Sequence, residues 1–278
     1  MKLPAAFSTA DSAPGTELDT VFVGVSTKMY LGYAQSLKWL EQLVAEVDAR
    51  PALAAGRVVP FVIPSFPVLP EAGRLLSGTP LVLGAQNCGW SDGPWTGEIS
   101  PSMLRELGVG LVEIGHAERR RYFAEDEAMI ALKVRAAVDA GLTPLLCVGE
   151  PDVLPAEAAA DTVYQQVKDA VSGDWSAASR LVIAYEPVWA IGAPEPASAE
   201  YVSQVVAAVR DSLSRHGLAR TPIIYGGSAK PGLLPQLDGV SGLFLGRFAH
   251  DATNFGRVLD EALSSCTADA PKRPSKGH

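Results

Sequence analysis

Three side chains that can take part in acid–base chemistry stand at the ends of short apolar runs in this sequence: Lys28, His116 and Glu186. A carboxylate can serve as a general base, a neutral imidazole can donate a hydrogen bond, and an ammonium group can stabilise a developing oxyanion. Each residue alone also has a structural explanation, because Lys28 could lie on the surface, His116 could cap a helix and Glu186 could simply meet water. Their common position indicates proton-transfer chemistry only if the apolar runs bring them together.

The apolar runs predict strands that are buried on both faces. Eight of them, short and without polar alternation, recur at 20–25, 58–63, 80–86, 109–115, 143–150, 181–186, 222–227 and 242–246. Between them lie helical patterns at 36–49, 127–140 and 199–216, the last with Ser198 as its N-cap and Glu200 in its first turn. Eight strands alternating with eight crossovers in about 250 residues predict an α/β fold, a single-domain (β/α)8 barrel.

A doubly wound open sheet is the alternative, but no Gly-x-Gly-x-x-Gly motif follows the first strand and the units are evenly spaced. In a barrel, the carboxyl ends of all strands open into one mouth, where the chemistry of such folds takes place. Lys28, His116 and Glu186 would then converge there, beside the glycine-containing segments 225–228 and 245–248. Because such groups are costly to bury without a purpose, their convergence favours a catalytic site.

The composition limits the possible partners. The 278 residues are 47% hydrophobic and 19% charged, with a net charge of −8 and no basic run, which argues against a nucleic-acid surface. No apolar stretch is long enough for a membrane span or a signal peptide, and three widely spaced cysteines form neither a disulfide framework nor a metal motif. We therefore expect a soluble cytoplasmic protein, without membrane association, whose barrel covers 19–266 between disordered tails at 1–18 and 267–278.

Six motifs, in this order, resemble those of the triosephosphate isomerase family: GAQN (84–87), WTGEISPSMLRELGV (95–109), GHAERR (115–120), CVGE (147–150), AYEPVWAIG (184–192) and YGGS (225–228). The resemblance extends over roughly 20–265. It implies an eight-stranded barrel that isomerises a small phosphorylated sugar and needs neither metal nor cofactor. It also implies a homodimer formed through the loop at 87–98, whose Trp90 and Trp95 would be awkward to expose on a monomer.

The resemblance also assigns catalytic roles. Glu186 would be the base that moves a proton between adjacent carbons, with its basicity raised by apolar neighbours, Val188, Trp189 and Ile191. His116, kept neutral at the start of a helix, would donate a hydrogen bond to the substrate oxygens. Lys28 would supply positive charge, and Glu118 would orient Lys28. Arg120 and Arg121, by contrast, are interpreted as an ordinary solvated run at a helix start.

Further matched positions concern substrate binding and a lid. The phosphate would be bound by backbone or hydroxyl donors at Gly192, Ser228 and Gly246, the kind of cradle that anions favour. The loop at 187–197 would be a lid that closes over the reaction intermediate. Residues assigned to the lid and to the tyrosine that holds it closed are Pro187, Val188, Trp189, Ala197 and Tyr225.

Several positions depart from the family pattern, and they cluster around the two ends of the substrate. Ser26-Thr27-Lys28 replaces the usual Asn-x-Lys, and the shorter Ser26 leaves room where the Asn would bind a substrate oxygen. Ala117 replaces a Ser after the motif histidine. Pro194 lacks the amide hydrogen that would bond to Ser228 in a closed lid. Arg247 replaces a Gly and would either clamp the phosphate or point outward.

Retained proton-transfer residues in an altered frame favour a related substrate. The resemblance then points to members of this family that interconvert tetrulose phosphates, L-erythrulose 1-phosphate and D-erythrulose 4-phosphate, and we expect such a substrate. The alternative is the triosephosphate isomerase reaction itself, between dihydroxyacetone phosphate and D-glyceraldehyde 3-phosphate. A third interpretation, a catalytically silent barrel that only binds phosphate, is weakened because every proton-transfer residue is present.

Overall fold

A computed structural model describes residues 20–268 of the chain. Its centre is a closed barrel of eight parallel strands that pair in sequence order, with the last strand against the first. The strands are β1 (Val21–Ser26), β2 (Val58–Ile63), β3 (Val82–Ala85), β4 (Leu111–Ile114), β5 (Thr143–Val148), β6 (Val182–Tyr185), β7 (Ile223–Tyr225) and β8 (Gly242–Leu245). The predicted (β/α)8 barrel is confirmed, and the open sheet is excluded because β8 pairs with β1.

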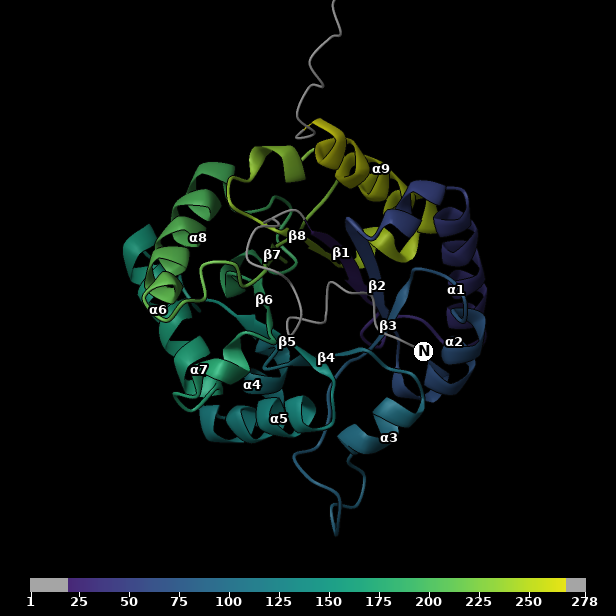
Figure 1. Ribbon diagram of the computed structural model, residues 1–278, viewed down its shortest axis with the longest axis horizontal. Coiled ribbons are helices and arrows are strands. Elements are labelled where there is room, and N and C mark those ends of the chain that lie inside the picture. The colour runs from purple at the N-terminus through teal and green to yellow at the C-terminus, as the bar shows by residue number, and fades with distance from the viewer. Residues whose placement is uncertain (1–19, 269–278) are drawn as a thin grey trace, which may run out of the picture.

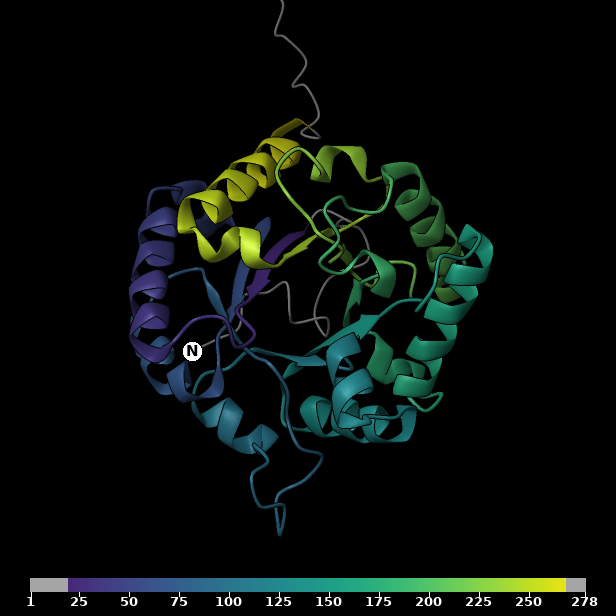
Figure 2. The same ribbon diagram turned by 180° about the vertical axis from the view of Figure 1, so that it is seen from behind.

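Helices surround the barrel as an outer ring, which is visible from both sides (Figures 1 and 2). They are α1 (Tyr33–Asp48), α2 (Leu69–Leu75), α3 (Pro101–Glu106), α4 (Ala117–Phe123), α5 (Glu127–Asp139), α6 (Ala156–Ala170), α7 (Trp175–Ala178), α8 (Ala199–Ser214) and α9 (Ala252–Ala268). Short 3-10 turns occur as η2 (Pro51–Ala55), η3 (Phe66–Val68), η4 (Val188–Ala190), η5 (Leu234–Gln236) and η6 (Arg247–His250). The ring closes where α9 packs against α1.

The predicted helices agree with the structure to within a few residues. The patterns at 36–49, 127–140 and 199–216 correspond to α1, α5 and α8. Ser198 is the N-cap of α8, as predicted, because its hydroxyl accepts a hydrogen bond from the amide of Tyr201.

Two apolar layers explain why the strands are continuous apolar runs. Side chains of a strand alternate between its two faces, so each strand of the barrel contributes to both layers. One layer fills the space between strands and helices. The other fills the barrel interior and includes Phe22, Phe61, Leu111, Leu145 and Phe244.

A buried ion cluster ties the start of the β3–α3 loop to the helices beside it. The Lys133 ammonium, on α5, donates to Oδ1 of Asn87 at 2.9 Å and forms an ion pair with Glu125. Arg119 of α4 pairs with the same Glu125 carboxylate at 2.6 Å. A buried lysine is tolerated where it is paired, and here the pairs connect three segments that surround β4.

The predicted tails at 1–18 and 267–278 lie outside the described residues, except that α9 extends to Ala268, two residues past the predicted end of the barrel at 266. Within residues 20–268, no helix is long and apolar enough to cross a membrane.

Candidate active site

A pocket of about 450 Å³ opens at the carboxyl ends of the strands, within the range of small-molecule sites. It is lined by residues of β1, β4 and β8 and of the segments that follow β1, β4, β6, β7 and β8. The predicted catalytic and binding residues all line it: Ser26, Lys28, His116, Glu118, Glu186, Gly192, Ser228, Gly246 and Arg247. Side chains that are far apart in the sequence therefore meet in one cavity, as the barrel requires.

The Glu186 carboxylate is buried at the end of β6, and the chain around it leaves space for it only because glycines are there. A Cβ atom on Gly226 would lie 2.4 Å from Oε1 of Glu186, and one on Gly149 would lie 2.0 Å from its carbonyl oxygen. Burial, and secondarily the nearby carboxylate of Glu113, raises the pKa of Glu186 to about 8, although Lys28 and the Cys147 thiol act in the opposite direction. Once ionised, Glu186 is a much stronger base than an exposed carboxylate.

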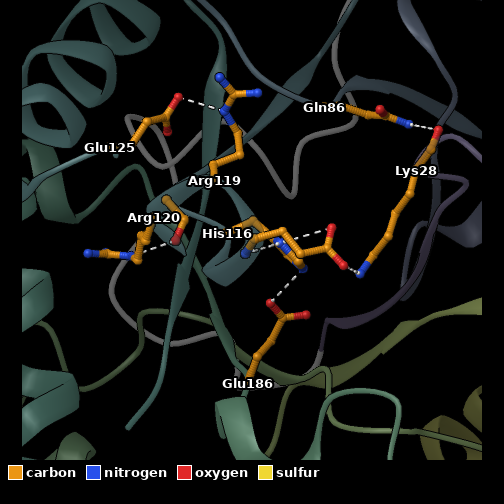
Figure 3. A network of polar contacts seen from close by, with 9 residues as sticks. Lys28, Gln86, His116, Arg119, Arg120, Glu125 and Glu186 are labelled. Carbon is orange, nitrogen blue, oxygen red and sulfur yellow. Dashed lines mark hydrogen bonds and ion pairs between the residues drawn. The ribbon is translucent and has the colours of Figure 1, made fainter. Parts of the chain in front are cut away.

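His116 faces Glu186 across the pocket and is held neutral (Figure 3). Its Nδ1 accepts a hydrogen bond from the amide of Glu118 at 3.1 Å, so the proton of the neutral ring lies on Nε2. Nε2 is 3.6 Å from Oε2 of Glu186. Burial, followed by the charge of Lys28, lowers the pKa of His116 to about 4. The structural role considered for His116, a helix cap, and the pocket-facing role coexist, because each uses a different ring nitrogen.

Lys28 occupies a backbone conformation that places its ammonium group in the pocket. Its φ of 47° is in the left-handed region, which is uncommon for a residue with a side chain. Its carbonyl oxygen accepts hydrogen bonds from Gln86 at 2.9 Å and Ser65 at 2.8 Å. Nζ donates to Oε1 of Glu118 at 2.7 Å (Figure 3). Burial lowers the pKa of Lys28, but the hydrogen bond with Glu118 and the charges of Glu118, Glu186 and Glu113 together outweigh burial, so the net pKa is raised and the group stays charged.

The predicted lid segment is held by hydrogen bonds to the end of β7 and to the loop after it. The amide of Ala197 donates to the Tyr225 hydroxyl at 3.0 Å. Ser228, with a φ of 49°, donates from its hydroxyl to the carbonyl oxygens of Ala190 at 3.1 Å and Ala193 at 2.8 Å. Pro194 has no amide hydrogen to offer Ser228, so this hydroxyl contacts lid carbonyl groups instead.

The base of the lid is anchored at Glu150. Nε1 of Trp189 donates to Oε1 of Glu150 at 2.9 Å, and the hydroxyls of Tyr185 and Tyr201 donate to the same oxygen. Of the three apolar neighbours predicted for Glu186, Ile191 lines the main pocket, and Val188 lines a smaller cavity that Glu186 also lines, while the indole of Trp189 is bound to Glu150. The predicted rise in the basicity of Glu186 agrees with burial as the largest cause of its raised pKa.

Two arginines carried sequence-based expectations: Arg247 as a phosphate clamp or an outward-pointing cation, and Arg120 as a solvated residue. Arg247 lines the pocket, and its guanidinium lies 5.5 Å from the centre of the Tyr30 ring. The interpretation of Arg120 as solvated was wrong. Its side chain is only 22% exposed, its Nε donates to the Gly115 carbonyl at 2.7 Å, and its guanidinium pairs with Glu127. Arg121 is exposed and lies over the Tyr122 ring.

The sequence reasoning missed Glu113, a buried carboxylate on β4 that lines the same pocket. The signal that could have found it is the one that drew attention to Glu186, an acid inside an apolar run. It also missed Gln86 and Ser65, whose contacts with the Lys28 carbonyl no sequence pattern reveals.

Among residues 20–268, no group of three or more His, Cys, Asp or Glu side chains is placed to hold a metal ion. The chemistry can be described with side chains alone. A base of raised pKa, a neutral hydrogen-bond donor and a fixed cation are what is needed to remove a proton next to a carbonyl and stabilise the enediolate that forms.

Comparison with known proteins agrees with this chemistry. A sequence model described as triosephosphate isomerase matches residues 21–262. A protein of Pectobacterium atrosepticum named L-erythrulose-1-phosphate isomerase is 46% identical over 255 residues, which cover 87% of this chain and 95% of the relative. Proteins of the same name from Mesorhizobium japonicum and Rhizobium etli are 41% and 38% identical, over 88% and 91% of this chain and 98% and 96% of their own lengths.

The raised pKa of Glu186 predicts a stability that depends on pH. Between about 4.5, the ordinary value, and about 8, the folded protein binds a proton that the unfolded chain has lost, so stability falls as pH rises through this window. Glu186→Gln removes the cost of the buried charge. We expect it to be more stable than the wild type at pH 8 by about 2–4 kcal/mol, and by little at pH 4.5.

Urea unfolding at both pH values measures this difference, and Glu41→Gln, an exposed position on α1, is the matched control. A Glu186→Gln variant with the same pH dependence as the wild type would mean that Glu186 titrates like an exposed acid.

Proposed function

This chain belongs to the triosephosphate isomerase family, and we propose that it interconverts L-erythrulose 1-phosphate and D-erythrulose 4-phosphate. The observation that supports the reaction type most directly is the approach of Nε2 of His116 to within 3.6 Å of Oε2 of Glu186, in a pocket that also contains Lys28. The observation that supports the substrate is the name shared by relatives up to 46% identical.

The proposed reaction is a proton transfer between two adjacent carbons. The ionised Glu186 carboxylate removes the proton from C3 of L-erythrulose 1-phosphate, and the electron pair moves through C2 to its oxygen, which gives an enediolate. Return of the proton to C2 leaves the carbonyl at C3, and this product is D-erythrulose 4-phosphate. No atom is gained or lost, so the reaction needs no co-reactant.

His116 and Lys28 stabilise the charge that develops on the two oxygens. The Nε2–H of His116 donates a hydrogen bond to the enediolate oxygens and can pass a proton between them, which a neutral imidazole does without adding a charge to the ground state. Lys28 provides the fixed positive charge, and its pair with Glu118 keeps the ammonium group in place.

The phosphate lies, in this proposal, at the other side of the pocket. Gly192, Ser228 and Gly246 line that region, with Lys230 and Arg247 as cations beside it. Lys230 also pairs with Glu195 of the lid at 2.7 Å, so it connects the lid to the loop after β7. A dianionic phosphate is matched by backbone donors together with these cations.

The isomerisation of triose phosphates remains the second candidate, because the residues that move the proton would serve it equally. Ser26 in place of an Asn favours the longer substrate, since it leaves space next to the reacting carbons. Side-by-side turnover of L-erythrulose 1-phosphate and dihydroxyacetone phosphate on one preparation decides between them. We expect kcat/KM for the tetrulose phosphate to be higher by at least about 10-fold, a difference of about 1.4 kcal/mol.

The variant Glu186→Asp, measured in the same turnover assay, tests whether Glu186 is the base. The shorter side chain withdraws the carboxylate by about one methylene, and a misplacement of about 1 Å can cost about 100-fold in rate, while a phosphorylated inhibitor should bind almost normally. A variant that retains more than half of the wild-type turnover would show that Glu186 is not the base. Equal turnover of both substrates by the wild type would contradict the proposed specificity.

A clamp on the phosphate is the proposed role of Arg247. Arg247→Gly should weaken binding of the substrate and of inorganic phosphate by about 10- to 150-fold, since a hydrogen bond to a charged group contributes about 1.5–3 kcal/mol. Arg220→Gly, an exposed position, is the control. Calorimetric titration with inorganic phosphate gives its dissociation constant for the wild type and both variants, and KM reports the change for the substrate. A change below about twofold for Arg247→Gly would leave it a surface cation.

We also propose a homodimer formed through the loop at 87–98. Residues 91–98 are exposed, and the loop projects beyond the ring of helices (Figures 1 and 2). Trp90 and Trp95 contact each other edge to face, with ring centroids 4.8 Å apart, and Trp95 remains 41% exposed. Because these rings pack on each other rather than into the barrel, the loop presents an apolar surface to a partner.

Light scattering at micromolar concentration should give twice the mass of the chain, and Trp95→Asp should give a monomer with reduced kcat. The control is Leu132→Asp, which places the same charge at an exposed apolar position on α5. A wild-type monomer with full activity would overturn this proposal.

A cytoplasmic location is proposed from the cysteines. Among the described residues, Cys88 and Cys147 are buried and form no disulfide, which suits a reducing compartment.

A further inference from the structure

Glu113 is a carboxylate inside the barrel that the proton transfer described above does not use. It lies two residues after Leu111 on β4, and Leu111 belongs to the apolar cluster that fills the barrel interior. Side chains two apart on a strand share a face, so Glu113 projects to the same side, where it lines the pocket. It is only 4% exposed, and burial raises its pKa to about 7. A buried carboxylate at a position that an apolar residue could fill indicates a function.

Ser26 is a polar neighbour of Glu113 in the pocket. It ends β1, is 5% exposed and lines the same cavity. Its hydroxyl faces Glu113 closely enough to lower the pKa of the carboxyl somewhat. Even so, Oγ of Ser26 and Oε2 of Glu113 are both buried without a hydrogen bond of good geometry among the described residues. Such groups nearly always have a partner, so the ligand is the natural candidate for it.

The position of Glu113 in the barrel matches one end of an extended substrate. In a closed ring of eight strands, β4 lies across from β8, whose loop carries Gly246 and Arg247 at the proposed phosphate site. A tetrulose phosphate has its phosphate at one end and a hydroxymethyl group at the other, beyond the two carbons that exchange a proton. A triose phosphate ends at the reacting carbons and lacks this group.

We propose that Glu113 and Ser26 form a subsite for the terminal hydroxymethyl group of a four-carbon substrate and thereby select it over a three-carbon one, an inference that rests on the proposed function. The terminal hydroxyl donates its hydrogen to Oε2 of Glu113 and accepts one from Oγ of Ser26. Both buried atoms then have partners. A shorter substrate would leave both atoms without this partner, and sites that bind a substrate hydroxyl discriminate strongly against analogues that lack it.

Glu113 has one other effect, which the test must separate from specificity. Its charge contributes to the raised pKa of Glu186, so its removal alters the base for every substrate. This effect changes the pH dependence of turnover equally for long and short substrates, and it vanishes at a pH at which Glu186 is ionised in all variants. Measurements near pH 9 therefore isolate the contact with the hydroxyl group.

The experiment compares L-erythrulose 1-phosphate with its 4-deoxy analogue, which has a methyl group in place of the hydroxymethyl group. With the wild type, loss of the hydroxyl should lower kcat/KM by about 10- to 100-fold. With Glu113→Val, the native substrate should lose about as much, and the analogue should change by less than about threefold. The penalty for removing the hydroxyl should thus nearly disappear in the variant.

Two further variants keep the proposal testable if Glu113→Val fails to fold. Glu113→Gln is similar in shape and retains an acceptor, so it should preserve most of the preference for the hydroxyl. It should also move the acid limb of the pH profile of kcat/KM to lower pH, because the charge that raises the pKa of Glu186 is gone. Ser26→Ala should weaken the preference without moving that limb.

The outcomes separate this inference from the proposed function. A wild type that prefers dihydroxyacetone phosphate overturns the proposed function and the subsite with it. A wild type that prefers the tetrulose phosphate, with a hydroxyl penalty that is unchanged in Glu113→Val and Ser26→Ala, overturns the subsite alone.

Discussion

The structure of the site depends on the burial of one carboxylate, that of Glu186 at the end of β6. Removing this group from water makes it a stronger base but costs stability, and the surrounding fold must compensate for that cost. Glycines 149 and 226 allow the backbone of neighbouring strands to approach it. Because the barrel is closed, these strands cannot separate to let water in. The packing of the apolar barrel interior stabilises the fold and offsets the free-energy cost of burying the Glu186 carboxylate.

Charge in the pocket is balanced by the ion pair of Lys28 with Glu118 and by the neutrality of His116. Lys28 is paired with Glu118, and His116 is kept neutral by burial and by the lysine itself. A protonated His116 would weaken the base that it faces at 3.6 Å, so its low pKa and the high pKa of Glu186 support each other. Lys28 has a strained, left-handed backbone conformation. The hydrogen bonds from Gln86 and Ser65 to its carbonyl oxygen stabilise this conformation and thereby hold the ammonium group in position.

The predicted lid is hydrogen-bonded at both ends and contains prolines that depart from the family pattern. Glu150 holds Trp189 at one end, and Tyr225 holds Ala197 at the other. Between them, prolines limit the backbone and Ser228 contacts carbonyl groups of the lid. In the proposed function, closure over a substrate would then require few new hydrogen bonds within the loop, and contacts with the phosphate, including those of charged side chains at the rim, would contribute more of the difference between open and closed states.

The sequence by itself determined the fold, because eight doubly buried strands separated by helices close into a barrel, and it placed Lys28, His116 and Glu186 at strand ends by their position after apolar runs. Short-range patterns also identified the Ser198 cap. Only the tertiary structure decided which groups face each other across the pocket. The inward direction of Glu113, the contact of Arg120 with Gly115 and the support of Lys28 by Gln86 all join residues whose distance is set by barrel closure and strand register. A one-residue change of register would turn Glu113 outward, and no local sequence pattern encodes that choice.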